Sequence, residues 1–270
     1  MSNSFLYQVT RVLGNPVFKN KYNQKIVDKD NIPSDGPIIL CGNHISELDP
    51  FVLISSTKRT IHFLLDKDSY DEGSKSLLKM MGMISVNDDD LESSMKYYLD
   101  YGGCTCFFPE GERNILTEAE LYELYKKKDC KVPFNEFKEL VDKNTLLSQI
   151  EYLESLYKSG VINLGEYKIA VLHAKTSLLE LVDRGIINND NYDDSLLLPF
   201  STKAVEIAKE TGATIVPFAN NGIYDKIGDN LVIRFGKGFK VSENDDIADV
   251  NFKLREKVKT LVKENIKNKF

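Results

Sequence analysis

A histidine and an aspartate lie five positions apart in residues 43–50, which read NHISELDP. Residues at this spacing do not share one helix face, so His44 and Asp49 can meet only across a turn. Pro50 disfavours the α conformation at Asp49, which favours such a turn. A carboxylate that holds one imidazole nitrogen leaves the other free as a general base. The pair therefore predicts proton transfer, and a packed structural histidine is the alternative interpretation.

A second candidate segment, residues 107–114, reads FFPEGERN and follows an apolar run of strand length. Gly111 would let the backbone approach a ligand closely. Arg113 offers forked N–H donors that suit a phosphate. The alternative is an ordinary strand-to-loop turn with a solvated Glu–Arg pair.

The other histidines and cysteines give weaker signals. His62 alternates with Phe63 in an apolar run and is expected to be packed. His173 has no acid at productive spacing. Cys104 and Cys106 share one strand face, but no second Cys/His pair accompanies them, so we expect no metal site.

Apolar runs of strand length alternate with helical patterns along most of the chain. The strand-like runs cover residues 38–41, 61–65, 83–86, 104–108, 214–218 and 231–235. The helical patterns cover residues 74–81, 91–101 and 204–211, and another helix is expected to start at Pro50. This alternation predicts an α/β fold with a mostly parallel central sheet flanked by helices. His44 would then lie at the carboxyl end of a strand, where such folds place their sites.

Residues 115–197 break the alternation and contain an internal repeat, in which residues 156–167 match residues 181–192. Residues 130–137 form a fainter copy. Each copy predicts a helix that ends at Gly, a short apolar link and a new helix opened by Asn or Asp. The pattern resembles the SHOCT-type helical hairpin. We therefore expect an all-helical insert, a candidate surface for a protein partner, within a domain formed by residues 1–114 and 198–270.

Amphipathic helices are predicted at both ends of the chain. The N-terminal apolar stripe consists of Phe5, Leu6, Val9, Val12 and Leu13, and Gly14 with Pro16 is expected to end this helix. A second helix covers residues 247–261. Both ends carry more basic than acidic residues. Two interpretations stay open, a face that docks on an anionic membrane and an ordinary solvated or core-packed face.

The composition excludes several classes of protein. The chain has 270 residues, of which 42% are hydrophobic and 28% charged, as expected for a globular protein of one or two domains. No apolar run reaches the roughly 18 residues of a spanning helix, and the N-terminus lacks the apolar core of a secretory signal. The net charge of −6 argues against general nucleic-acid binding, and four cysteines suit a reducing cytosol.

Together the two candidate segments resemble the glycerolipid acyltransferases, the lysophosphatidate acyltransferase family. The first block of that family, Asn-His-x4-Asp, is complete at Asn43, His44 and Asp49. The third block, Phe-Pro-Glu-Gly-Thr-Arg-Ser, is matched by residues 108–114 except that Glu and Asn replace Thr and Ser. Residues 215–218 match the apolar Ile-Val-Pro stretch of the fourth block.

This resemblance implies an O-acyltransferase that moves a fatty acyl group to the hydroxyl of a lysophospholipid such as 1-acyl-glycerol-3-phosphate. His44 would act as general base, oriented by Asp49. The implied substrate-binding residues are Asn43, Glu110, Gly111, Arg113 and Lys67. No metal or cofactor is implied besides the acyl donor, which is acyl-CoA, acyl-carrier protein or acyl phosphate. Because acceptor and product reside in the bilayer, we expect a cytoplasmic protein attached peripherally to an anionic membrane surface.

The second block departs from the family pattern Gly-x-Ile-x-Val-Asp-Arg, whose Arg is thought to hold the acceptor phosphate. Here Asn87 and Asp88 stand where Asp-Arg is usual. A carboxylate beside a phosphate would repel it. Recognition would then rest on Arg113 with Lys67, or the acceptor is not a simple phosphate monoester. The departure also supports an alternative, a catalytically degenerate acyltransferase fold that serves as a lipid-binding or scaffold module through its insert.

Overall fold

The computed structural model describes residues 4–66, 83–86, 91–128, 131–142, 145–223 and 230–267. It divides the chain into two compact units, Met1–Glu112 with Pro199–Phe270 and Arg113–Leu198. The helix predicted over residues 74–81 lies outside the described residues.

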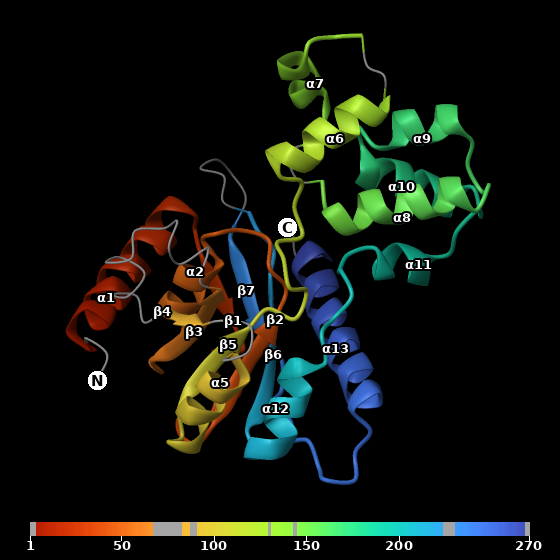
Figure 1. Ribbon diagram of the computed structural model, residues 1–270. Coiled ribbons are helices and arrows are strands. Elements are labelled where there is room, and N and C mark those ends of the chain that lie inside the picture. Colours follow the sequence, from red (N-terminus) through yellow and green to blue (C-terminus); the bar gives the residue numbers. More distant parts are fainter. Residues whose placement is uncertain are drawn as a thin grey trace. The chain divides into compact units, whose positions relative to one another are not determined.

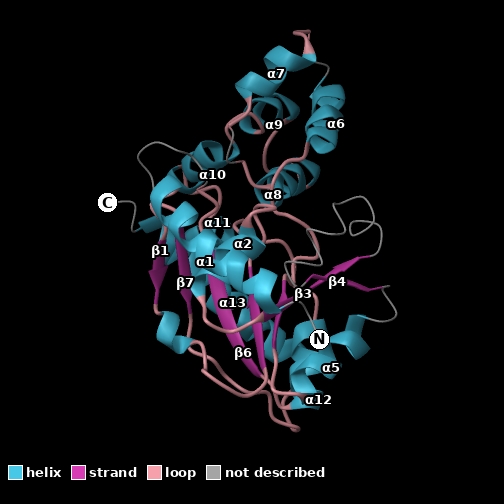
Figure 2. Ribbon diagram, turned by 90° about the vertical axis from the view of Figure 1, so that its left-hand side faces the viewer, coloured by secondary structure: helices cyan, strands magenta, loops and turns pink. Residues whose placement is uncertain are grey.

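The first unit contains, within its described residues, a seven-stranded sheet of order β1-β7-β6-β2-β5-β3-β4 (Figures 1 and 2). The strands are β1 (Lys25–Val27), β2 (Ile38–Gly42), β3 (Ile61–Asp66), β4 (Met83–Val86), β5 (Cys104–Phe107), β6 (Thr214–Asn220) and β7 (Val232–Phe235). Neighbouring strands are parallel except β6 and β7. The predicted mostly parallel sheet is therefore confirmed.

Helices cover both faces of this sheet (Figure 1). They are α1 (Ser4–Lys21), α2 (Asp49–Ser56), α5 (Leu91–Asp100), α12 (Lys203–Thr211) and α13 (Ile247–Lys267), and a short 3-10 turn spans Lys29–Asn31. Side chains alternate along a strand, so Ile38 and Leu40 join the core cluster with residues of α1 and α2. All five residues of β2 are buried, as a central strand covered on both faces requires.

The first helix is longer than the sequence predicts. Gly14 and Pro16 predict its end, but α1 continues across Pro16 to Lys21. Tertiary contacts on both sides of the proline explain the difference. The hydroxyl of Tyr7, a side chain with 2% exposure, accepts a hydrogen bond from Ile61 N at 2.8 Å. Tyr22, just beyond the helix, is buried in the same core cluster. Packing at both ends outweighs the one hydrogen bond that a proline removes.

The second unit is helical and has its own apolar core. Its helices are α6 (Glu118–Lys128), α7 (Phe134–Leu140), α8 (Leu147–Lys158), α9 (Leu164–Ala170), α10 (Ala174–Asp183) and α11 (Asn189–Asp194). The start and end of the unit are tied together by Asn114, whose Nδ2 donates to Leu196 O at 3.1 Å. The first unit makes an equivalent tie where the chain leaves and returns, since Ser201 N donates to Pro109 O at 2.8 Å.

The two strong copies of the internal repeat fold as their pattern predicts. Gly160 and Gly185 follow α8 and α10 with positive φ of 75° and 69°. Asn163 and Asn188 then open α9 and α11, each in a reciprocal capping box. In the faint copy Pro133 takes the N-cap position and makes no side-chain cap. The similarity to SHOCT hairpins stays a prediction.

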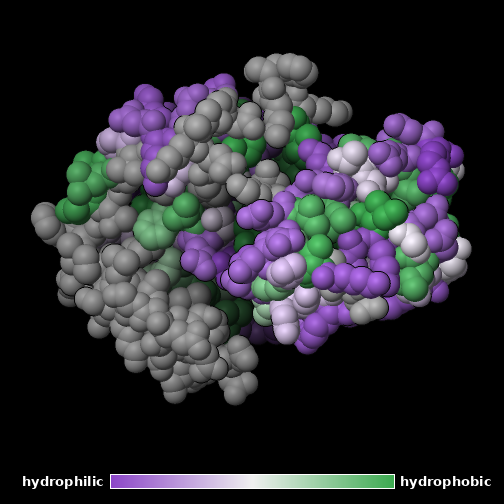
Figure 3. All heavy atoms as spheres, turned by 90° about the horizontal axis from the view of Figure 1, so that it is seen from above, coloured by the Kyte–Doolittle hydropathy of each residue, from purple (hydrophilic) through white to green (hydrophobic). Residues whose placement is uncertain are grey.

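None of the helices among the described residues has both the length and the apolar character needed to cross a membrane. The face seen in Figure 3 mixes hydrophilic and hydrophobic residues. Val12 and Leu13 of the N-terminal stripe are 61% and 63% exposed.

Candidate active site

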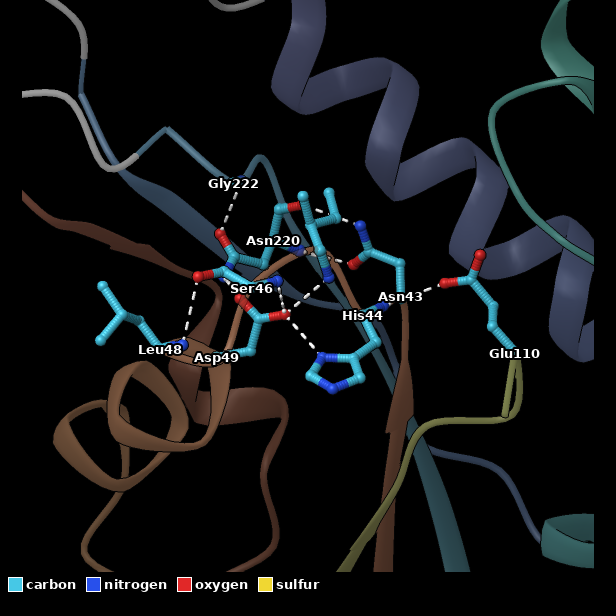
Figure 4. Close-up of polar contacts among 9 residues, drawn as sticks. Asn43, His44, Ser46, Leu48, Asp49, Glu110, Asn220 and Gly222 are labelled. Atoms are coloured by element: carbon cyan, nitrogen blue, oxygen red, sulfur yellow. Dashed lines mark hydrogen bonds and ion pairs between the residues drawn. The ribbon is translucent and has the colours of Figure 1, made fainter. Parts of the chain in front are cut away.

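The candidate site lies at the carboxyl end of β2, which pairs with β5 on one side and β6 on the other. His44 follows β2 directly after Asn43. Glu110 follows β5, and Asn220 is the last residue of β6 (Figure 4). Three neighbouring parallel strands therefore deliver these side chains to one edge of the sheet.

A turn after β2 brings His44 and Asp49 together. Asp49 N donates to Ser46 O at 3.0 Å, and the helix α2 begins at Asp49, one residue before the predicted start. His44 Nδ1 then lies 2.9 Å from Asp49 Oδ2. The meeting across a turn that the spacing predicts is thus observed.

The Asp49 carboxylate accepts hydrogen bonds at both oxygens and is 1% exposed. Oδ2 also accepts from Ile45 N at 2.7 Å and from Ser46 N at 2.9 Å, and Oδ1 accepts from Asn220 Nδ2 at 2.7 Å. Since this carboxylate acts as an acceptor throughout, His44 Nδ1 must carry the proton that it donates. The neutral ring then has its lone pair on Nε2, which is the form a general base needs.

The plane of the His44 ring is fixed by aromatic contacts. The ring stacks on Phe108 with centroids 4.0 Å apart. Phe108 in turn meets Phe218 of β6 edge to face at 6.1 Å. The His44 side chain retains 19% exposure, so a reactant can reach a ring whose orientation is set by the protein.

Glu110 and Gly111 hold the loop around His44. Glu110 is 8% exposed, and its Oε1 accepts from His44 N at 2.9 Å. Gly111 is exposed, has a φ of 79° and donates from N to Phe108 O at 3.1 Å. Left-handed backbone in a turn explains the glycine, where the sequence suggested close approach to a ligand. In the structure both residues position protein groups.

Asn43 bridges the ends of β2 and β6. Its Nδ2 donates to Asn220 O and its Oδ1 accepts from Asn220 N, both at 2.8 Å, and the side chain is 2% exposed. A Cβ on the preceding Gly42 would overlap Phe218 O, so glycine permits this close approach of the strands. Both side-chain polar atoms of Asn43 are thus engaged within the protein, where the resemblance implied substrate contact.

Of the two remaining predicted binding residues, Arg113 and Lys67, the structure describes only Arg113. Arg113 is the first residue of the second unit and is half-buried. Lys67, Asn87 and Asp88 lie outside the described residues.

The other histidines and the cysteine considered in the sequence analysis, His62, His173 and Cys104, contact protein groups or are buried. His62 stacks on Tyr98 at 4.0 Å, and burial lowers its pKa. His173 finds an acid distant in sequence, with Nδ1 3.1 Å from Asp142 Oδ1, and both side chains are exposed. Cys104 is 1% exposed, and burial raises the pKa of its thiol to about 12, which favours the protonated form at neutral pH.

Asn220 is the residue that the sequence analysis missed. Nothing marks it locally beyond its place at the end of the Ile-Val-Pro-Phe-Ala run. Its partner Asp49 lies 171 positions away, so only the pairing of β2 with β6 makes the contact visible.

The family model described as Acyltransferase matches residues 23–221. A curated relative, "Probable 1-acyl-sn-glycerol-3-phosphate acyltransferase" of Mycoplasma pneumoniae, is 26% identical over 161 residues, which cover 54% of this chain and 59% of the relative. The match thus spans less than two thirds of the relative's length.

Among solved structures, the 1-acyl-sn-glycerophosphate (LPA) acyltransferase PlsC from Thermotoga maritima superposes with a TM-score of 0.59 and 13% identity. The superposition covers 99% of this chain and 82% of that one, and it shows a shared fold. Because the family model matches most of the chain, including His44 and Asp49, the protein belongs to the acyltransferase family.

Proposed function

We propose that this protein is an O-acyltransferase that moves a fatty acyl group from a thioester or acyl phosphate donor to the hydroxyl of a lysophospholipid such as 1-acyl-glycerol-3-phosphate. The observation that carries the proposal is the 2.9 Å contact between His44 Nδ1 and Asp49 Oδ2, which leaves Nε2 as a base. The names of the two relatives above support this choice of acceptor.

In the proposed reaction, His44 Nε2 takes the proton of the acceptor hydroxyl while its oxygen attacks the carbonyl carbon of the donor. A new ester C–O bond forms and the bond to the thiolate or phosphate leaving group breaks. The imidazolium then returns its proton to the leaving group, which departs as a thiol from a thioester donor or as hydrogen phosphate from an acyl phosphate donor. Asp49 stabilises the imidazolium in the meantime, and the enzyme forms no covalent intermediate.

The protein contributes chiefly by fixing the base before the substrates arrive. Glu110 holds the backbone of His44, Phe108 holds the plane of its ring, and Asp49 sets its tautomer. Holding reacting groups in place lowers the entropic part of the barrier. Recognition of a phosphate stays assigned to Arg113 and Lys67 by sequence alone.

The lipid acceptor also places the proposed enzyme at a membrane surface. The α1 helix presents Val12 and Leu13 to solvent, and Arg11 lies beside them in the sequence. Exposed apolar side chains next to a basic residue suit an anionic bilayer.

The test compares acyl transfer to lysophosphatidate by the wild type, His44→Ala and His173→Ala. His173 is the matched control because it also contacts an aspartate, but lies in the second unit. We expect His44→Ala to lower kcat about 100- to 10,000-fold, and His173→Ala to keep wild-type rates. Acyl-CoA, acyl-carrier protein and acyl phosphate are each offered as donor, with acceptors that carry or lack a phosphate. Equal rates for wild type and His44→Ala well above background would contradict the role of His44 as base. Background rates for both, with every donor, would contradict catalysis and favour the lipid-binding or scaffold alternative.

A further inference from the structure

Asn220 has a side chain whose two polar atoms are both engaged at the candidate site, and it is 1% exposed. Nδ2 donates to Asp49 Oδ1 at 2.7 Å, and Oδ1 accepts from Gly222 N at 3.0 Å (Figure 4). These partners fix the orientation of the amide. If it were flipped, its NH2 would face the N–H of Gly222 and its oxygen would face a carboxylate.

The contact acts on the carboxylate oxygen that His44 does not use. Oδ2 of Asp49 receives His44 Nδ1 and two backbone N–H groups. Contacts at one oxygen locate that atom but allow the carboxylate to pivot about it. The hydrogen bond from Asn220 fixes the second oxygen, and with it the plane of the carboxylate.

The backbone around Asn220 supports this contact independently of its side chain. Asn43 binds both the N and the O of Asn220. Gly222 lies so close to Ile45 that an added Cβ would be 2.6 Å from Ile45 Cγ2. The end of β6 and the turn after β2 thus pack against each other at two further points.

We infer that Asn220 is a positioning residue, which holds the plane of the Asp49 carboxylate and thereby the Nδ1–H tautomer and orientation of His44. The inference rests on the proposed function, since His44 is the base assigned there. Removal of Asn220 Nδ2 acts on the base through Asp49, so substrate binding need not change.

The main variant is Asn220→Leu, which keeps the number and branching of the side-chain heavy atoms and removes both the donor to Asp49 and the acceptor for Gly222 N. We expect kcat for transfer from acyl-CoA to lysophosphatidate to fall about 10- to 100-fold, with the KM for the acceptor within about twofold of wild type. The second readout is the ¹⁵N NMR spectrum of the imidazole nitrogens in the neutral ring. In Asn220→Leu the fraction of neutral His44 that carries its proton on Nδ1 should be lower than in wild type. The chain has three histidines, and His173 serves as internal reference.

Asn220→Asp is the conservative variant, because it keeps an acceptor for Gly222 N. Its carboxyl can donate to Asp49 only while the two carboxylates share a proton. We therefore expect its kcat, relative to wild type, to fall as the pH rises, which Asn220→Leu should not show. The other titratable groups here are Glu110, which contacts His44 N, and the buried thiols Cys106 and Cys41, and all variants share them.

The matched control is Asn265→Leu. Asn265 of α13 is also 1% exposed, donates to Ala219 O at 3.0 Å and accepts from Arg234 Nε at 3.2 Å. The substitution removes an equally buried amide, whose hydrogen-bond partner Ala219 is the residue before Asn220. We expect it to lower the stability of the fold while the Nδ1–H fraction of His44 and kcat stay near wild type.

The inference is overturned if folded Asn220→Leu keeps the wild-type kcat and tautomer, or if Asn265→Leu reproduces both effects. If Asn220→Leu does not fold, the pH dependence of Asn220→Asp tests the inference instead. A kcat that falls relative to wild type as the pH rises supports it, and a constant ratio to wild type overturns it. If the wild type transfers no acyl group but the tautomer responds in Asn220→Leu alone, the proposed function fails and the positioning role stands.

Discussion

The imidazole of His44 lies nearly parallel to the ring of Phe108, with an angle of 17° between their planes. The stack couples a residue after β2 to a residue after β5, and the edge contact with Phe218 extends it to β6. The orientation of the candidate base therefore depends on side chains from three strands.

Replacement of Phe108 by Leu should lower kcat for acyl transfer about tenfold, because the ring of His44 loses the surface that fixes its plane. Phe108→Tyr keeps the stack and is expected to stay within about threefold of wild type. Steady-state kinetics on both variants check this. A wild-type kcat in Phe108→Leu would show that the stack does not position the base.

Replacement of both Val12 and Leu13 by Ser should weaken co-sedimentation with vesicles that contain anionic lipid by about 100-fold, because the burial of each side chain is worth about 1.5 kcal/mol and that of the two together about 3 kcal/mol. Since both side chains are exposed, the Tm should not change. Ile169→Ser is the control, as Ile169 is 69% exposed and lies in the second unit. Deletion of the whole helix is a poorer test, because it removes the buried Tyr7.

Folding stability should decrease as the pH falls through about 6.5, the ordinary pKa of a histidine. Burial lowers the pKa of His62 in the folded protein, so the unfolded chain takes up a proton there before the folded one does. The unfolded state then binds more protons, and the free energy of unfolding drops with acidification. Urea unfolding of wild type and His62→Phe at pH 7.5 and about 5.5 measures this. An unchanged pH slope in His62→Phe would contradict it.

Loss of either capping box should destabilise the second unit. Asn163→Ala and Asn188→Ala are each expected to lower the free energy of unfolding by about 1 kcal/mol. The two effects should add in the double variant, because each box closes on its own helix. Urea denaturation followed by circular dichroism tests the prediction, which is wrong if the double variant unfolds like wild type.

The parts of the site that the sequence predicts are those encoded locally. The apolar run before His44 identifies β2, and the spacing to Asp49 leaves a turn as the one way for the pair to meet. The role of Asn43 depends instead on Asn220, 177 positions away, and on the register between β2 and β6. An amide in a motif does not reveal whether its partner is a substrate or a backbone. The sequence therefore identified the pair and named Asn43 and Glu110, but it did not reveal their contacts with the protein, and it missed Asn220.

Local rules also failed where distant packing competes with them. A glycine and a proline predict the end of α1 after Leu13, yet contacts of Tyr7 and Tyr22 keep the helix intact across Pro16. Such contacts have no signature in the helix's own sequence, because their partners belong to other elements.

The ties at the ends of the two units have a consequence for how the chain folds. Strands β5 and β6 are neighbours of β2, but the whole second unit separates them in sequence. Its helices make contacts between nearby residues, which form fast. Once the bond from Asn114 to Leu196 joins its ends, the long connection between β5 and β6 behaves as a shorter one. The search that brings β6 to β2 then starts from a chain whose effective loop is reduced from residues 108–213 to residues 108–114 and 196–213.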